Sequence, residues 1–197
     1  SFSRVDFREA DLTQASFHSA DLSDCNLAGM TLKDVVLSEA DLSRADLSGA
    51  TLDGVDLRGT WGRGTNLSGA SLVGANLSET ELNHFRAEQA NFSQANLTRA
   101  QIGNADLSDA RFTGATFAGD FAFLWECNLS GADFTNADLR GVGFDDSNLE
   151  EADFSGARLD GATLDGVNLK GARITAEQLA AVASLKGATL PDGTVHA

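Results

Sequence analysis

The feature that most constrains the fold of this chain is a period of five residues. Between Ala40 and Gly59 the sequence reads ADLSR ADLSG ATLDG VDLRG, with a leucine at the centre of each unit. A period of five fits neither the 3.6-residue period of a helix nor the two-residue period of a strand. The leucines gather on one side only if the chain turns after every unit. Each unit is therefore predicted to be a short extended side followed by a corner.

The direction of each side chain follows from this arrangement, because residues two apart in an extended segment point the same way. Ala40 and Leu42 are expected to face inward, whereas Asp41 faces outward. Ser43 and Arg44 form the corner. Four such sides would close a coil of twenty residues, and successive coils would stack into a solenoid.

The motif A(D/N)LxG, read here at residues 45–49 and 75–79, resembles the repeat of the pentapeptide-repeat family. The resemblance implies an all-β solenoid, the right-handed quadrilateral β-helix of that family. Large apolar centres recur every five residues from Phe7 to Phe117 and from Leu124 to Ile174, which gives 34 units with two exceptions, Gly62 and Ala87. At ~4.8 Å per paired strand, this predicts about 8.5 coils in one elongated domain.

The repeat frame slips by two residues after Phe117, and we assign the insertion to Asp120 and Phe121. The predicted boundaries are residues 1–174 for the β-helix and residues 175–197 for a C-terminal helix and tail that cap the last coil. Thr175 and Gln178 have the spacing of a capping box, which indicates the start of a helix.

The two ends of the rod are expected to differ. After the helix start, Leu179, Val182 and Leu185 could form an apolar stripe over the last coil. Residues 185–194 are also similar to the tail of many cyanobacterial-type pentapeptide-repeat proteins. No matching cap is visible before Phe7, so a missing cap, a partner or association of two chains end to end or as a homodimer could cover that end.

Two departures from the repeat concern the core. Phe85 and Ala87 invert the usual order of small and large residues, which we interpret as a swap that conserves volume, although the ring could instead be displaced outward. Cys25 and Cys127 occupy inward positions five coils apart, beyond disulfide reach. We expect both cysteines to be reduced and buried.

Composition and motifs limit the possible functions. A net charge of −15 argues against direct binding of nucleic acid, since phosphate contacts need Lys and Arg. No apolar run is long enough to cross a membrane and no signal peptide is visible, so we expect a cytoplasmic protein. His18, His84 and His196 lack metal-ligand spacing, and a filled solenoid offers no substrate pocket. We therefore expect no enzyme activity, no cofactor and no metal.

One of the four predicted sides combines acidity with aromatic residues. It carries eight carboxylates against Arg44 and Arg63, and its aromatic residues are expected to point outward. Alternatively, Trp61 could fold over Gly62, and the other rings could pack around the insertion. Exposed tryptophans are favoured interface anchors. The predicted partner-binding residues of this side are Trp61, Phe123, Trp125, Asp41, Glu81, Glu126, Asp145 and Asp146.

Three interpretations of this surface follow. The first is a non-catalytic, rod-like scaffold that binds a protein partner through the aromatic side. The second comes from the resemblance. Some members of the family, the quinolone-resistance proteins, are thought to mimic DNA, so the resemblance implies an acidic rod that binds gyrase or another topoisomerase. The third is an acidic surface that only keeps the rod soluble. We choose the scaffold as the principal hypothesis.

Overall fold

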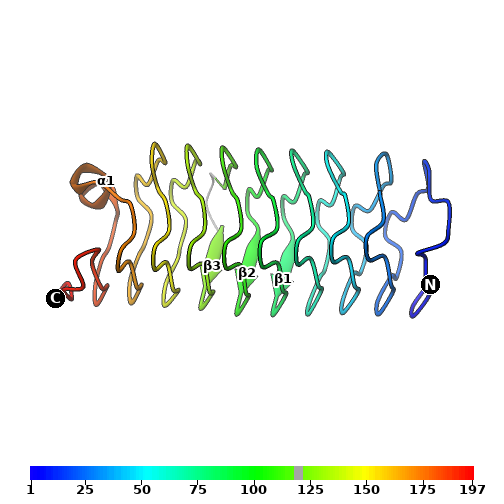
Figure 1. Cartoon of the computed structure of the whole chain (residues 1–197), viewed down its shortest axis with the longest axis horizontal. Coiled ribbons are helices and arrows are strands. Elements are labelled where there is room, and N and C mark those ends of the chain that lie inside the picture. Colours follow the sequence, from blue (N-terminus) through cyan, green and yellow to red (C-terminus); the bar gives the residue numbers. More distant parts are fainter. Residues whose placement is uncertain (118–121) are drawn as a thin grey trace.

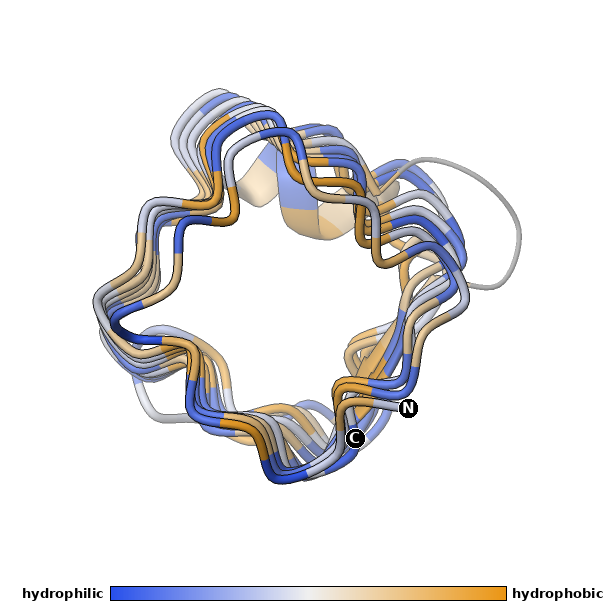
Figure 2. Cartoon of the chain, turned by 90° about the vertical axis from the view of Figure 1, so that its right-hand side faces the viewer, coloured by the Kyte–Doolittle hydropathy of each residue, from blue (hydrophilic) through white to orange (hydrophobic). Residues whose placement is uncertain are grey.

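The computed structural model of the chain describes residues 1–117 and 122–197. Its coils lie side by side along one long axis, with the two termini at opposite ends (Figure 1). Viewed along that axis, the coils superimpose around a closed outline whose inner positions are largely hydrophobic (Figure 2). The chain is therefore the predicted β-helical solenoid. Asp120 and Phe121, the predicted insertion, lie outside the described residues.

Successive coils are joined by parallel ladders whose partners are 20 residues apart over most of the rod. Leu42 donates its backbone N–H to Trp61 O at 2.7 Å, and the Trp61 N–H donates to Ala40 O at 3.1 Å. Four adjacent pairs share this spacing: Asp41 with Trp61, Asp46 with Asn66, Thr51 with Ser71, and Asp56 with Asn76. A regular coil therefore takes four five-residue units. The handedness of the solenoid and its exact number of coils stay predictions.

The spacing of the ladders changes at two places. Pairs that span residues 118–121, such as Thr116 with Asp138, are 22 residues apart, which places two additional residues in that coil. The next pair on the same side, Asp138 with Arg158, returns to 20. The second change is near the C-terminus, where Thr163 pairs with Ser184 and Asn168 with Thr189 at a spacing of 21.

The corners explain the fifth position of the repeat. The Ala45 N–H donates to Leu42 O at 2.9 Å, which closes a four-residue turn, and Arg44 within it has a φ of +59°. Gly49 has the same role in the next unit with a φ of +64°. A turn of this kind requires a positive φ at its third residue, which glycine adopts at the lowest cost.

Three units contain a strand of three residues, and these strands form one parallel sheet in the order β1-β2-β3. The strands are β1 (Glu81–Asn83), β2 (Gln101–Gly103) and β3 (Phe123–Trp125). Their register pairs Glu81 with Gln101 and Gln101 with Phe123. Most of the remaining described units pair through isolated bridges.

The core is the predicted column of large apolar centres. In part of it, the rings of Phe92, Phe112, Phe134 and Phe154 stack in neighbouring coils, with centroids 4.9–5.3 Å apart. These spacings are favourable for aromatic pairs. Phe85 is only 1% exposed and Ala87 is fully buried. The inverted unit is therefore a compensated core variant, and the alternative of an outward ring is wrong.

The C-terminal end is covered by helix α1 (Ala176–Ala181). Thr175 accepts from the Gln178 N–H while the Gln178 side chain accepts from the Thr175 N–H, as the capping-box spacing predicts. Leu179, Val182 and Leu185 are partly buried against the core.

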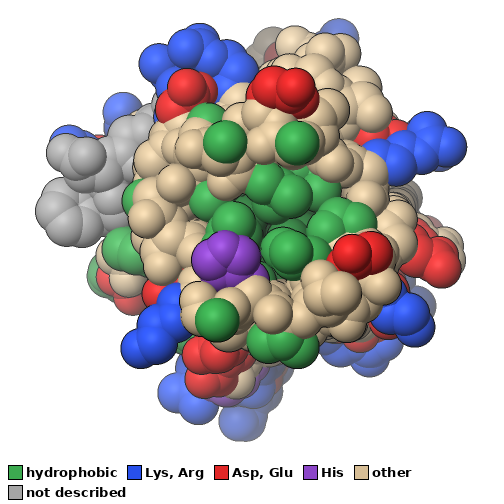
Figure 3. All heavy atoms as spheres, turned by 90° about the vertical axis from the view of Figure 1, so that its left-hand side faces the viewer, with side chains coloured by type: hydrophobic (Ala, Val, Ile, Leu, Met, Phe, Trp, Pro, Cys, Tyr) green, Lys and Arg blue, Asp and Glu red, His purple; other side chains and the backbone are tan. Residues whose placement is uncertain are grey.

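Beyond the helix, Ser184 and Thr189 pair with Thr163 and Asn168, so two further sides follow α1. Apolar side chains still show in the middle of this end (Figure 3).

The N-terminal end begins one unit earlier than the predicted frame. Phe2 donates its N–H to Asp21 O, and its ring lies 5.4 Å from Phe17 and 6.1 Å from Phe7, between centroids. Phe2 remains 44% exposed, and Val5 is also exposed. The first coil is thus partly covered by the chain's own residues and leaves apolar surface at that end of the rod.

Candidate functional site: the tryptophan side

The eight predicted site residues lie on one side of the rod. Their units share a ladder of outward residues that runs from Asp41 through Trp61, Glu81, Gln101 and Phe123 to Gly143. We call this ladder and its units the tryptophan side. Trp61, Glu81, Gln101 and Phe123 are all exposed, and they follow one another in register. Three ladder steps separate Trp61 from Phe123, or roughly 14 Å at ~4.8 Å each.

Strands β1 to β3 form on this side because their units do not close as the others do. In a regular unit the outward Asp or Asn accepts the N–H two residues later; Asp46 Oδ1 accepts from Ser48 at 3.0 Å. This local bond favours a turn over an extended strand. Glu81, Gln101 and Phe123 make no such bond in the described structure. The lack of this bond does not by itself produce a strand, because the unit of Trp61 also lacks it and still closes, with the Thr65 N–H donating to Gly62 O at 3.2 Å.

The corner hydrogen bond is also missing from the three strand units, among the described residues. Instead, Ser147 Oγ donates to Leu124 O at 2.6 Å, and Cys127 Sγ lies 3.6 Å from Ile102 O. The first of these corners contains Phe85, a large ring at a position where alanine is usual. At β3 the Cys127 N–H donates to Ser147 Oγ at 3.0 Å instead of to Leu124 O.

Two aromatic residues of this side rest on glycines of neighbouring coils. A Cβ added to Gly103 would collide with the indole of Trp125, and one added to Gly143 would lie 2.8 Å from the Phe123 ring. Both glycines are buried beneath these rings. Trp125 is accordingly half-buried and Phe123 is 38% exposed. The sequence left open whether these rings point outward or pack around the insertion; in the structure each lies against the side of the rod, where glycine leaves room for it.

Trp61 differs from these two rings, because it is 57% exposed. The space beside Gly62 is filled from the next coil by Leu82, whose Cδ2 lies where a Cβ of Gly62 would be. The core gap is therefore closed without the indole, and the structure favours an outward Trp61 over one that folds across Gly62.

The carboxylates of this side divide into two groups. Those near the ends are bound within the chain. Arg44 donates two hydrogen bonds of 2.7 Å to Asp24 and lowers its pKa, and the Ser23 and Ser1 hydroxyls lower the pKa of Asp21 to about 2. Asp41 accepts from the Ser43 N–H at 2.9 Å.

The second group lies in the middle of the side. Glu81, Glu126 and Asp146 have neither an ion pair nor a side-chain hydrogen bond within the described part of the chain. The buried oxygen Asp145 Oδ1 also lacks a donor among the described residues, as does Asn83 Oδ1. These groups are the unmatched acceptors of the tryptophan side.

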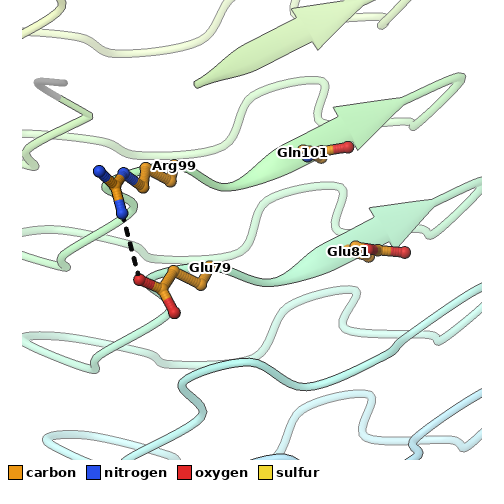
Figure 4. A pocket seen from close by; sticks show the side chains of 4 residues that line it. All are labelled: Glu79, Glu81, Arg99 and Gln101. Carbon is orange, nitrogen blue, oxygen red and sulfur yellow. Dashed lines mark ion pairs between the residues drawn. The ribbon is translucent and has the colours of Figure 1, made fainter. Parts of the chain in front are cut away.

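An open groove of about 440 Å³ crosses the face of β1 and β2, lined by Glu79, Glu81, Arg99 and Gln101 (Figure 4). Arg99 and Glu79 form an ion pair of 3.6 Å at the corner before the strands. Glu81 and Gln101 project in parallel from β1 and β2, away from that pair. The charge of Glu79 is thus matched, while Glu81 presents an unmatched carboxylate.

Other reactive groups do not assemble into a site in the part of the chain that the structure describes. No group of three or more His, Cys, Asp or Glu side chains could hold a metal ion there. Cys25 and Cys127 are free and buried, and burial raises the pKa of the Cys127 thiol to about 12. Within the same residues, no helix has the length and apolar character needed to cross a membrane.

The sequence predicted the tryptophan side and its residues, but not that Phe123 and Trp125 pack on glycines. The signal was present, because Gly62, Gly103 and Gly143 are the glycines of the repeat region that lie outside corner positions, and all three belong to the tryptophan side. The role of Gln101 between Glu81 and Phe123 was also missed.

Comparison with solved structures finds several similar chains. HetL, a pentapeptide repeat protein from the cyanobacterium Nostoc sp. strain PCC 7120, is 31% identical, with 100% of this chain and 93% of that chain covered and a TM-score of 0.49. QnrB1, a plasmid-mediated fluoroquinolone resistance protein, is 20% identical over 95% of this chain and 90% of that chain, with a TM-score of 0.41. Rfr23 from the cyanobacterium Cyanothece 51142 is 28% identical over 64% of this chain and 91% of that chain, with a TM-score of 0.43.

No match was found among curated proteins. Two profiles described as pentapeptide repeats match residues 1–38, 20–59, 63–84 and 75–114 in one case and residues 124–177 in the other. These matches cover more than half of the sequence, and the chain belongs to the pentapeptide-repeat family.

Proposed function

We propose that the chain is a non-catalytic, rod-like scaffold that binds a protein partner through the tryptophan side. The observation that carries this proposal is the run of four exposed side chains, Trp61, Glu81, Gln101 and Phe123, in one ladder. Three of them stand on the regular strands β1 to β3.

A surface of this kind suits protein recognition for physical reasons. Trp61 can bury a large ring against a partner, and tryptophan is among the residues that contribute most to interfaces. The paired strands fix the backbone positions of Glu81, Gln101 and Phe123, so the backbone loses little conformational entropy on binding. The unmatched carboxylates of the same side add charge that can select the partner and speed its approach.

The test is affinity capture with the full chain as bait, using Trp61→Ser and the matched control Val36→Ser. Val36 is 38% exposed and lies on another ladder, paired with Ser16 and Asp56. We expect one partner from the source organism to be captured by the wild type and by Val36→Ser, and to be lost with Trp61→Ser. Equal capture by all three baits would overturn the proposal.

The acidity of the chain favours a second candidate, an acidic rod that mimics DNA and acts on gyrase or another topoisomerase. Duplex DNA carries one charge per ~1.7 Å of its axis, and the chain carries a net charge of −15 along a rod predicted to be roughly 40 Å long. The free carboxylates Glu81, Glu126 and Asp146 would then provide the contact.

A supercoiling assay separates the two candidates. A DNA mimic should inhibit or protect gyrase at micromolar concentration, and the combined variant Glu81→Gln, Glu126→Gln, Asp146→Asn should lose the effect. No effect of the wild-type rod on gyrase would remove this candidate and leave the scaffold.

Association of two rods remains part of the proposal. Both ends carry exposed apolar residues, Phe2 and Val5 at the first coil and Val195 at the tail. A partner protein on the tryptophan side would not compete with contacts at either end.

A further inference from the structure

The strongest local feature of the tryptophan side is the pair Trp61 and Glu81. They are direct partners in the parallel ladder, so their side chains leave the rod on the same face about one strand spacing apart, ~4.8 Å. Trp61 is exposed and Glu81 has no cation or hydrogen-bond donor within the described residues. An aromatic face and an unmatched carboxylate therefore stand side by side.

The groove on the face of β1 and β2 borders this pair at Glu81 and does not include Trp61 in its lining. Glu81 belongs to its wall together with Gln101, and the opposite corner is closed by the Glu79–Arg99 ion pair (Figure 4). With Glu79 matched by Arg99, the remaining charge at this wall is that of Glu81. Glu81 therefore offers an unmatched negative charge to a positive group that can also contact the neighbouring Trp61 ring.

We propose that Trp61 and Glu81 form a subsite for one arginine side chain of the partner protein. This inference rests on the proposed scaffold function and names the chemistry that its surface selects. A guanidinium group can place its flat face on an indole while its N–H edge donates to a carboxylate, and both partners are present at the required spacing. A lysine ammonium lacks the planar face and the paired donors, so the subsite favours arginine.

The other aromatic residues of this side do not offer the same chemistry. Phe123 has neutral ladder neighbours, Gln101 and Gly143, and its ring rests on Gly143. Trp125 lies over Gly103. Trp61 is the more exposed of the two ladder rings, and both of its ladder neighbours, Asp41 and Glu81, are acidic.

The two tryptophans provide a direct experiment. The ¹⁵N-labelled full chain has two indole N–H signals, which Trp61→Phe and Trp125→Phe assign. The probe is acetyl-Ala-Arg-Ala-amide, and its matched control is the same tripeptide with neutral citrulline. We expect the arginine peptide to shift the Trp61 signal saturably, with a dissociation constant of about 10 mM, and to leave the Trp125 signal in place.

The role of Glu81 is tested by Glu81→Gln against Glu126→Gln, which removes another free carboxylate of the same side. We expect binding to weaken by about threefold or more with the first variant and to remain unchanged with the second. Equal shifts with arginine and citrulline, no shift up to about 50 mM peptide, or wild-type affinity of Glu81→Gln would overturn the arginine subsite.

The failure of this inference can be told apart from failure of the scaffold function. If Trp61→Ser loses the captured partner but the peptide does not bind at Trp61, the scaffold stands and the arginine subsite is rejected. If the peptide binds and Trp61→Ser still captures the partner, the subsite exists but does not serve that partner, and the inference is again rejected.

Discussion

The ladder through Asp46 and Asn66 and the ladder through Trp61 and Glu81 occupy the same stretch of the rod but use their polar groups differently. Asp46 Oδ1 accepts hydrogen bonds from the Ser48 N–H and from Asn66 Nδ2, at 3.0 and 3.1 Å. Glu81 accepts none within the described residues. In the first ladder Asp46 holds its corner and joins two coils, whereas in the second ladder Glu81 is left for solvent or a partner.

The regular ladders therefore stabilise the rod, whereas the tryptophan side leaves polar groups available for recognition. Regular units repeat A(D/N)LxG because each position has a structural task, so their surfaces carry little information about function. The tryptophan side departs from that repeat at its centre, in its outward residues and in its glycines. Its rings and free carboxylates stand on strands that the regular coils support.

The largest effect is expected from Phe85→Ala, which removes the buried ring beneath the open corner of β1. A cavity of this kind costs about 3–5 kcal/mol in the free energy of unfolding, measured by denaturant titration. The double variant Phe85→Ala, Ala87→Leu restores the regular order of small and large residues and should recover more than half of that loss. If the double variant is no more stable than the single one, the swap is not compensated as described.

Gly103→Ala tests whether Trp125 needs a glycine beneath its ring. The added methyl group would collide with the Trp125 indole, so we expect a loss of about 1–3 kcal/mol in stability. In the background of Trp125→Ala the same substitution should cost little, because the collision partner is gone. Equal costs in both backgrounds would show that Trp125 does not lie on Gly103.

The matched pair Asp46→Ala and Glu81→Ala compares the two ladders directly. Asp46→Ala removes an acceptor used by two hydrogen bonds and should destabilise the chain by about 1 kcal/mol. Glu81→Ala should change stability by less than about 0.5 kcal/mol, because no internal contact is lost. Similar losses of stability in both variants would show that Asp46 and Glu81 do not differ in their structural role.

Trp61→Ser is expected to have the smallest effect on stability. The ring is largely exposed and Leu82 fills the gap beside Gly62, so the unfolding free energy should change by less than about 0.5 kcal/mol. Thermal unfolding of the variant beside the wild type measures this. A loss as large as that of Gly103→Ala would mean that Trp61 is part of the fold.

The sequence predicts most of the fold because the repeat assigns every position a direction. The inward column, the outward ladder and the Thr175 capping box could all be derived from spacing, and the structure agrees with each. The seating of Phe123 and Trp125 could not, because it depends on which residue stands one coil away. Their position in the repeat predicts an outward direction for both rings, but Gly103 and Gly143 have no side chain, so the rings pack against the surface of the rod.

The sequence also does not predict which carboxylates lack a hydrogen-bond or ion-pair partner. Asp41 and Glu81 occupy equivalent outward positions, yet Asp41 accepts from the Ser43 N–H and Glu81 does not. The Glu81 unit also lacks the corner hydrogen bond among the described residues, whereas the Asp41 unit has it, from the Ala45 N–H to Leu42 O. Only the structure shows which acidic residues hold the coils together and which remain available.

The most direct test of the central claim is photo-crosslinking in cells of the source organism, with a benzophenone amino acid at position 61 or at position 36. Both positions are exposed, but they lie on different ladders. If the tryptophan side is the partner-binding surface, position 61 should give a discrete adduct with one protein and position 36 should not. The same adducts from both positions, or an adduct from position 36 alone, would contradict the account.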